Sequence, residues 1–222
     1  MPRSTWRTQG RTTYLLAALL ALLFAYPFLD DSLPHRLIGG FLNVAILVTA
    51  AYAASASRRM LPVAVLLAVP SFGLQVAYSL TKDPAVGDLL FLTYAIFYGF
   101  TIVHVLRYVL MPGEVTADKI CGAIAGYILT GLLWTSLYLF LDRLHPGSFF
   151  YRGMEDSTQL LDFPDLLYFS FITLTTTGYG DVVPVTGHAR SLAILEQLAG
   201  TFYIAILIAR LTGLYQGGGT RG

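Results

Sequence analysis

"TTTGYGD", residues 175–181, interrupts an otherwise apolar part of the chain just before its last hydrophobic segment. Glycine stands at alternate positions in this stretch, as Gly178 and Gly180. Glycine tolerates left-handed backbone dihedrals best, and alternating left- and right-handed dihedrals turn successive carbonyl groups to the same side of a chain. The stretch therefore predicts a row of carbonyl oxygens from Thr176, Thr177, Gly178 and Tyr179, extended by the Thr176 hydroxyl. Such a row can replace water around a cation.

The composition indicates that the rest of the chain lies in a membrane. Of its 222 residues, 55% are hydrophobic and only 12% are charged, against about 25% charged in an ordinary soluble domain. Apolar runs recur throughout, and a bilayer core of roughly 30 Å accepts helical runs of about 20 apolar residues. We therefore expect an all-α membrane protein in contact with lipid.

Other classes of partner and chemistry find little support. A net charge of +1 gives no reason to expect a nucleic-acid partner. The single cysteine, Cys121, excludes an internal disulfide, and the four scattered histidines lack metal-ligand spacing. We expect no cofactor other than a permeant ion.

Six apolar segments are long enough to cross the bilayer as helices. They cover about residues 12–29, 37–56, 61–80, 88–110, 116–141 and 190–215. A seventh run, residues 165–174, is too short to cross and predicts a re-entrant helix leading into residues 175–181. The first segment follows three arginines, as in a signal peptide, but no small-x-small cleavage site follows it.

The distribution of basic residues predicts the orientation. With the amino terminus in the cytosol, nine Lys and Arg residues fall on the inner side and five on the outer side. The prediction is a multi-pass protein of the cell (plasma) membrane with both termini cytoplasmic. Residues 175–181 then open outward, beside a long external loop, residues 142–164, that is acidic when taken together with the start of the short helix at Asp165.

The stretch "LMPGEVTADK", residues 110–119, divides the chain into two blocks. Pro112 and Gly113 break the helical pattern, and Thr116 can cap the helix that follows. Residues 1–111 form a four-helix transmembrane block, residues 116–215 an outer helix, short helix, loop and inner helix, and residues 216–222 a flexible tail. The fourth segment offers only His104 and Arg107 where a voltage sensor needs several arginines at every third position. We expect weak or no voltage dependence.

A single loop cannot surround an ion, and the chain holds one copy. Filters built from carbonyl oxygens use a closed cyclic arrangement of four loops, so we predict a homotetramer. The short helix before the loop would aim the partial negative charge of its carboxyl end at the pore centre and favour cations there.

These residues resemble the tetrameric potassium channels of the pore-loop superfamily, whose signature is Thr-Val-Gly-Tyr-Gly-Asp. The resemblance covers about residues 116–215 and is strongest to prokaryotic six-helix members, here without a full voltage-sensor arginine ladder. It implies a selectivity filter that coordinates K⁺ through Thr176, Thr177, Gly178 and Tyr179, with Gly180 and Asp181 at its outer mouth.

The resemblance also implies supporting roles. Tyr168 and Phe169 match an aromatic pair that packs around Tyr179, and the Tyr168 hydroxyl can donate a hydrogen bond to Asp181. Gly200 matches a hinge glycine of the inner helix. Thr177 departs from the pattern because it replaces valine and adds a hydroxyl that needs a partner.

Four further residues lie in the last segment. Glu196 is an ionisable group within an apolar helix, where a functional role is the default. Two interpretations stand side by side: Glu196 or a bound water satisfies threonine hydroxyls behind the filter, or the carboxyl group bonds to a neighbouring helix or to the base of the pore helix. Thr201, Ile204 and Ile208 share one helical face, which fits either a cavity lining with a gate or plain packing.

The predicted function is passive, potassium-selective ion conduction, and the protein is not expected to be an enzyme. Three alternatives remain. A weakly selective monovalent cation channel would share the fold, with a filter loosened at Thr177. A K⁺ transporter subunit fits less well, since such systems carry four degenerate loops in one chain. A membrane enzyme would need a nucleophile, base or metal site that the loop lacks.

Overall fold

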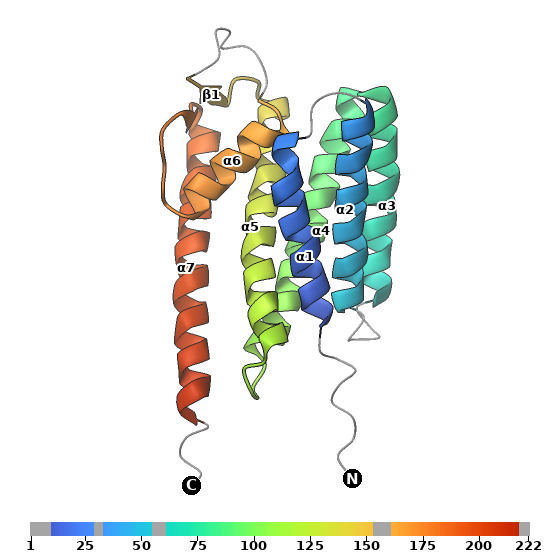
Figure 1. Ribbon diagram of the computed structural model, residues 1–222. Coiled ribbons are helices and arrows are strands. Elements are labelled where there is room, and N and C mark those ends of the chain that lie inside the picture. The colour runs from blue at the N-terminus through green and yellow to red at the C-terminus, as the bar shows by residue number, and fades with distance from the viewer. Residues whose placement is uncertain (1–9, 29–32, 55–60, 153–160, 218–222) are drawn as a thin grey trace.

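The computed structural model describes all residues except 1–9, 29–32, 55–60, 153–160 and 218–222. It is predominantly helical, as expected for the predicted class (Figure 1). In chain order the elements are α1 (Arg11–Ala25), the 3-10 turn η2 (Tyr26–Phe28), α2 (Leu33–Ala54), α3 (Leu61–Thr81), α4 (Pro84–Leu110), α5 (Ala117–Leu144), β1 (Phe149–Tyr151), α6 (Phe163–Leu174), β2 (Val182–Pro184) and α7 (Gly187–Gly217).

The long helices stand side by side along a common direction, and α6 lies obliquely at one end, between α5 and α7 (Figure 1). The start of α1 and the end of α7 lie at the opposite end from β1. We call the end that carries β1 and β2 the outer end, and the end that carries the α4–α5 connection the inner end. Helix α7 continues to Gly217, two residues beyond the predicted segment, and the remainder of the predicted tail lies outside the described residues.

Among the described residues, four helices are long and apolar enough to cross a membrane: Pro62–Thr81, Pro84–Leu110, Ala117–Leu144 and Gly187–Arg210. Helix α1 is apolar but has only 15 residues, a rise of about 22 Å. The described apolar part of α2, Ile38–Ala53, is also shorter. The protein is thus a multi-pass helical membrane protein, whereas six crossings remain a prediction.

The connection between α4 and α5 forms as its residues predict. The chain bends at Met111, Pro112 and Gly113, and α5 starts directly after Thr116. The Thr116 hydroxyl accepts a hydrogen bond from the Lys119 backbone N–H at 3.3 Å, which satisfies one of the free donors of the first helical turn.

One hydrophobic core joins the first four helices to the rest of the chain. It contains Leu15 and Leu19 of α1, Phe97 of α4, Leu129 of α5 and Leu167 of α6. Gly122 lets the helices approach closely, because a Cβ atom there would lie 3.1 Å from Val109 of α4 and 3.3 Å from Thr12 of α1. The break near residue 112 therefore does not separate two independent cores.

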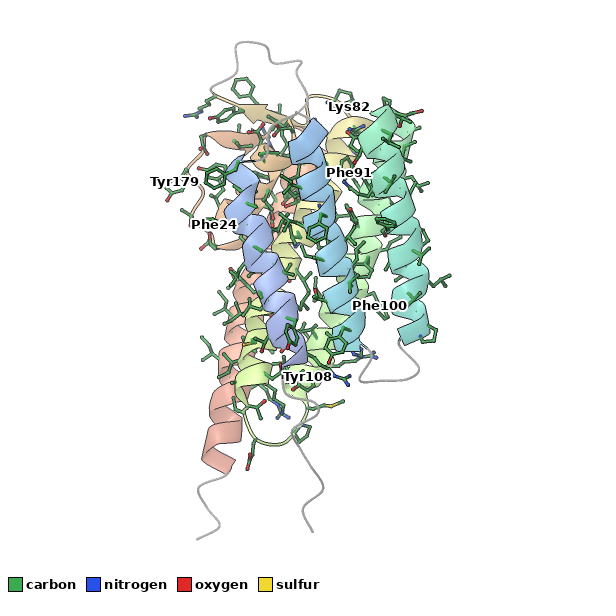
Figure 2. All side chains as sticks on the ribbon, turned by 45° about the vertical axis from the view of Figure 1, so that its right-hand side comes forward. Phe24, Lys82, Phe91, Phe100, Tyr108 and Tyr179 are labelled. Atoms are coloured by element: carbon green, nitrogen blue, oxygen red, sulfur yellow. The ribbon has the colours of Figure 1, made fainter. Side chains whose placement is uncertain are left out.

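A buried carboxylate fastens α1 and α4 to the inner end of α5. Asp118 is 5% exposed, and its side chain accepts hydrogen bonds from the backbone N–H groups of Gly10 and Thr12, both at 3.1 Å. It also accepts from the Thr12 hydroxyl at 2.9 Å and from the Tyr108 hydroxyl at 2.8 Å. Figure 2 shows Tyr108 at this end of the bundle.

Arg143 ties the outer ends of α3, α4 and α5. Its guanidinium donates to the Tyr78 hydroxyl at 2.6 Å and lies 3.7 Å from the Asp88 carboxylate. It also lies over the rings of Tyr78 and Phe91, at 5.4 and 5.2 Å from their centroids. Figure 2 shows Phe91 and Lys82 at this outer end, opposite Tyr108.

The outer loop is tied to the segment before α7. Strands β1 and β2 pair antiparallel, with Phe149 opposite Pro184 and Tyr151 opposite Val182. Asp142, at the outer end of α5, accepts hydrogen bonds from the backbone N–H groups of Ser148 at 3.0 Å and Leu161 at 3.3 Å. Both flanks of α6 are therefore anchored to its neighbours.

The Asp118 contacts lead to a stability prediction. Asp118→Ala leaves the Tyr108 hydroxyl and two backbone N–H groups without their acceptor, and each buried unsatisfied group costs about 1–3 kcal/mol. We expect a clearly lower midpoint of heat-induced unfolding in detergent, measured by circular dichroism. Glu114→Ala, at an exposed position in the neighbouring connection, is the control; equal midpoints for both variants would contradict the role of Asp118.

Candidate functional site

Helix α6 lies against α5 and α7 at positions where those helices lack a side chain. It starts at the outer end and runs part of the way down, and the loop after it returns to the outer end (Figure 1). A Cβ atom on Gly131 of α5 would lie 2.8 Å from the Phe171 ring of α6. Real Cβ atoms essentially never approach other atoms this closely, so a side chain at position 131 would force the Phe171 ring to move.

The carboxyl end of α6 is held just as closely. A Cβ atom on Gly200 of α7 would lie 2.3 Å from the Leu174 carbonyl oxygen. The Tyr127 hydroxyl of α5 donates to that same oxygen at 3.3 Å. Close packing therefore explains the glycine at position 200 without a hinge, and the predicted hinge remains a prediction.

The loop after α6 alternates in backbone handedness. Thr176, Gly178 and Gly180 have φ angles of 58°, 54° and 76°, while φ is not positive at the residues between them. A Cβ atom at Gly178 or Gly180 would meet nothing within 4 Å, so the dihedral angle and not lack of space requires glycine there. Thr176 adopts the left-handed region despite its side chain, at a cost of about 1–2 kcal/mol.

The first N–H groups of the loop fold back onto α6. The N–H of Thr176 donates to the Thr173 carbonyl at 2.9 Å, and the N–H groups of Thr177 and Gly178 donate to the Ile172 carbonyl at 2.8 and 3.1 Å. Within the described part of the chain, no donor reaches the carbonyl oxygens of Thr176, Thr177, Gly178 or Tyr179. The first three N–H groups of the loop thus have acceptors within the chain, while its carbonyl oxygens are left available for a ligand.

The threonine hydroxyls pair with each other. The Thr175 hydroxyl donates to the Phe171 carbonyl at 2.7 Å and lies 2.9 Å from the Thr177 hydroxyl. The extra hydroxyl at position 177 therefore has the partner that it was expected to need. The prediction that Glu196 supplies this partner is wrong.

Glu196 instead takes the alternative contacts, with the neighbouring helix and α6. Its carboxyl group is fully buried and bonds to the Tyr138 hydroxyl of α5 and the Ser170 hydroxyl of α6. The physical reason is position: Ser170 lies in the middle of α6, a full turn above the loop, so Glu196 reaches the helix and not the threonines.

Tyr168 makes the two contacts predicted for it. Its hydroxyl donates to the Asp181 carboxylate at 2.7 Å, and its ring is parallel to the Tyr179 ring at 6.5 Å between centroids. The hydrogen bond from Tyr168 holds the pKa of Asp181 below its ordinary value. Tyr179 itself is 72% exposed in a single chain and projects from the bundle in Figure 2.

Phe169 does not join this aromatic contact. It is buried on another side of α6, with ring centroids 5.1 Å from Tyr138 and 5.4 Å from Phe149. An α-helix turns consecutive side chains about 100° apart, so Tyr168 and Phe169 cannot both face the loop of their own chain. Within one chain, Phe169 supports the loop only by packing α6 against α5.

Thr201, Ile204 and Ile208 lie on the exposed surface of α7. The Thr201 hydroxyl bonds to the Gln197 carbonyl of its own helix at 2.9 Å, and in a single chain these three residues do not come together with the loop. Sequence reasoning missed Gly131, Tyr127, Tyr138 and Ser170. A usable signal was available, since each is a glycine or polar residue inside an apolar segment.

Comparison with known proteins finds matches to part of this chain. Residues 123–216 match the model of a family described as "Ion channel". Two-pore potassium channel 4 of Arabidopsis thaliana is 36% identical over 62 residues, which is 28% of this chain and 22% of the relative. Potassium voltage-gated channel subfamily A member 4 of Homo sapiens is 30% identical over 76 residues, 34% of this chain and 12% of the relative.

A third relative, potassium voltage-gated channel subfamily A member 2 of Xenopus laevis, is 32% identical over 76 residues, which is 34% of this chain and 15% of the relative. The chain thus spans less than a quarter of the length of each of these curated relatives. Residues 123–216 thus match an ion channel family, and the resemblance to pore-loop potassium channels is confirmed for this part of the chain. The matches indicate an ion channel and not an enzyme.

The contact at Gly200 generates a prediction that separates packing from flexibility. Gly200→Ala places a methyl group against the Leu174 carbonyl and should displace α6, so we expect a lower yield of folded protein and a reduced unfolding midpoint. Gly99→Ala in α4 is the matched control, because a Cβ atom there meets nothing within 4 Å. A fully stable Gly200→Ala variant would show that close packing is not the reason for glycine.

Proposed function

We propose that the protein is a homotetrameric, potassium-selective channel of the cell membrane that conducts K⁺ passively. In this proposal the chain crosses the membrane six times with both termini cytoplasmic, α6 is a re-entrant pore helix and residues 176–180 form the filter. The observation that carries the proposal is the loop itself. Left-handed φ angles alternate at Thr176, Gly178 and Gly180, and four neighbouring carbonyl oxygens accept no hydrogen bond from the described residues.

Unpaired carbonyl groups at membrane depth cost several kcal/mol each unless something satisfies them. A dehydrated cation does so when oxygens from several chains converge on it, and rings of backbone carbonyls are the coordination used for K⁺. One chain supplies one side of such a ring. A closed fourfold arrangement supplies the rest.

The exposed surface of α7 supports assembly. Ile194, Leu198 and Phe202 are 58%, 47% and 58% exposed in a single chain. Large apolar exposure rimmed by polar groups marks an interaction surface or contact with lipid. In a tetramer, α7 would face the pore axis and the neighbouring subunits, with Thr201, Ile204 and Ile208 available to line a cavity or gate.

The charges near the loop favour cations. The carboxyl end of α6 points its partial negative charge toward the start of the loop, and Asp181 stands at the loop's other end. Asp162 caps α6 by accepting from the Asp165 N–H at 3.2 Å. Burial, with the neighbouring Asp162 carboxylate second, raises the pKa of Asp165 to about 6.

The fourth helix supports weak or absent voltage dependence. The His104 ring stacks on Phe100, with centroids 6.4 Å apart, and Arg107 is exposed in the last turn of α4. Two basic side chains of this kind carry too little charge across the field for steep voltage-dependent opening, at about 2.3 kcal/mol per charge per 100 mV.

The filter assignment gives a paired prediction. Gly178→Ala puts a side chain on a residue with a φ angle of 54°, which disturbs the carbonyl row, so we expect loss of K⁺ flux into proteoliposomes. Thr177→Val keeps the β-branched shape and removes only the Thr175–Thr177 contact, so we expect flux to continue. Potassium and sodium gradients are measured in parallel, with barium as a blocker.

The same measurement distinguishes the weakly selective channel. Comparable K⁺ and Na⁺ permeability in the wild type, sharpened by Thr177→Val, would favour that alternative. Conduction by Gly178→Ala equal to the wild type would contradict the proposed filter.

Asp165 generates a pH prediction. Above pH 6 its carboxylate is ionised and adds one negative charge per subunit near the mouth; acidification through about pH 6 neutralises it. We expect unitary K⁺ current at low ionic strength to fall roughly two-fold between external pH 7 and pH 5. Asp165→Asn should show the lower current at both pH values, and an equally steep pH dependence in that variant would exclude Asp165 as the cause.

A further inference from the structure

Glu196 is a fully buried carboxyl group that conduction does not require as an ion ligand. It lies in α7, one turn before Gly200, and is 0% exposed. From α7 it contacts one side chain on each of two other helices, Tyr138 of α5 and Ser170 in the middle of α6. It therefore stands where outer helix, pore helix and inner helix meet.

Three close oxygen–oxygen contacts form a chain through this point. The Tyr138 hydroxyl bonds to Glu196 Oε2. The Ser170 hydroxyl lies 2.5 Å from Glu196 Oε1 and 2.8 Å from the Gly131 carbonyl oxygen of α5. Gly131 is also the position where the missing side chain lets α6 approach α5.

Each of these contacts needs a hydrogen atom between its two oxygens. Tyr138 and Ser170 supply one hydroxyl hydrogen each, and the Gly131 carbonyl supplies none. Two hydrogens cannot fill three contacts. With an ionised Glu196, one pair of oxygens would face each other at hydrogen-bonding distance with no hydrogen between them.

A proton on Glu196 Oε1 completes the count. The acid then donates to Ser170, Ser170 donates to Gly131, and Tyr138 donates to Glu196 Oε2. Asp142 gives a useful contrast, because its contacts with Ser148 and Leu161 come from backbone N–H groups that bring their own hydrogens. The hydrogen count of these two contacts closes without an added proton.

The energetics of the site agree with this count. A charged side chain inside a membrane helix is costly, and such groups occur paired or facing water. The two partners of Glu196 among the described residues are neutral hydroxyls, and no Lys or Arg forms an ion pair with it there. A neutral acid avoids the cost of a buried charge.

We propose that Glu196 is held in the protonated form at neutral pH and acts as a positioning residue that fixes α6 between α5 and α7. Its consequence for conduction rests on the proposed function, since α6 carries the loop. The proton itself follows from the contacts of the chain alone.

Loss of this proton at alkaline pH should loosen α6. The titratable groups facing Glu196 are Tyr138 and Tyr127 of α5, while α6 contributes the Ser170 hydroxyl. A carboxylic acid ordinarily releases its proton at lower pH than a phenol does, so we expect Glu196 to be the first of these groups to ionise as pH rises. The hydrogen bonds by which Glu196 fixes α6 are thus present at low and neutral pH, and they weaken as pH increases.

Infrared difference spectroscopy of the purified full chain in lipid tests the proton directly. A protonated carboxyl group has a C=O stretch that a carboxylate lacks. We expect this band at neutral pH in the wild type, its loss in Glu196→Gln and its retention in Glu114→Gln, an exposed glutamate. An unchanged band in Glu196→Gln would show that Glu196 is ionised and would overturn the proposal.

A variant series tests the positioning role. Glutamine mimics the neutral acid, with one donor toward Ser170 and one acceptor for Tyr138, so Glu196→Gln should keep the neutral-pH stability of the assembled protein and lose its alkaline sensitivity. Glu196→Ala should lower stability, and K⁺ flux about ten-fold, because it breaks the chain of contacts. Glutamine behaving as poorly as alanine would contradict the neutral acid.

The spectrum and the stability profile do not require conduction. If the protein carries no K⁺ flux but shows the Glu196 band, the proposed function fails and the proton assignment stands. If flux is normal and the band is absent, the reverse holds.

Discussion

The close approach of α6 to α5 and α7 is the contact on which the position of the loop depends. Gly131 and Gly200 lack side chains on the two sides of α6: a methyl group at Gly200 would collide with the Leu174 carbonyl oxygen, and one at Gly131 with the Phe171 ring. Around these glycines stand hydroxyl groups from Tyr127, Tyr138 and Ser170, which bond across the interface. In a bilayer, helices gain no hydrophobic driving force from one another, so small residues and such hydrogen bonds decide their packing.

The sequence was sufficient to predict the loop because that feature is local. Alternating glycines permit alternating dihedrals, and Gly178 and Gly180 have the positive φ angles that this pattern predicts. The helix break at Pro112 and Gly113, the cap at Thr116 and the Tyr168–Asp181 hydrogen bond were predictable for the same reason or from the family signature. The bilayer thickness also explains why the short apolar run before the loop was not expected to cross the membrane; it forms the 12-residue helix α6.

The contacts that could not be predicted from the sequence are those between segments far apart along the chain. Glu196 stands 26 residues from Ser170 and 58 from Tyr138, and no local pattern indicates which of several buried hydroxyls it meets. Phe169 does not face Tyr179 within one chain, because adjacency in sequence is not adjacency on a helix. The shared core of α1, α4 and α5 was missed for a related reason. The break at residue 112 indicates a bend in the backbone, but a bend does not determine whether the helices on its two sides pack together.

Tyr203 has a consequence for how the inner end of the protein can move. Its hydroxyl donates to the Ala123 carbonyl of α5 at 2.6 Å, in a notch left by Gly126. Arg210, two turns further, donates to the Leu110 carbonyl at the end of α4. If α7 pivots below Gly200, either these two hydrogen bonds break or α5 and α4 move with α7. In the second case α1 moves too, because Asp118 of α5 is bonded to Thr12 of α1. As long as these hydrogen bonds hold, a displacement of α1 is coupled through α5 and α4 to the inner half of α7.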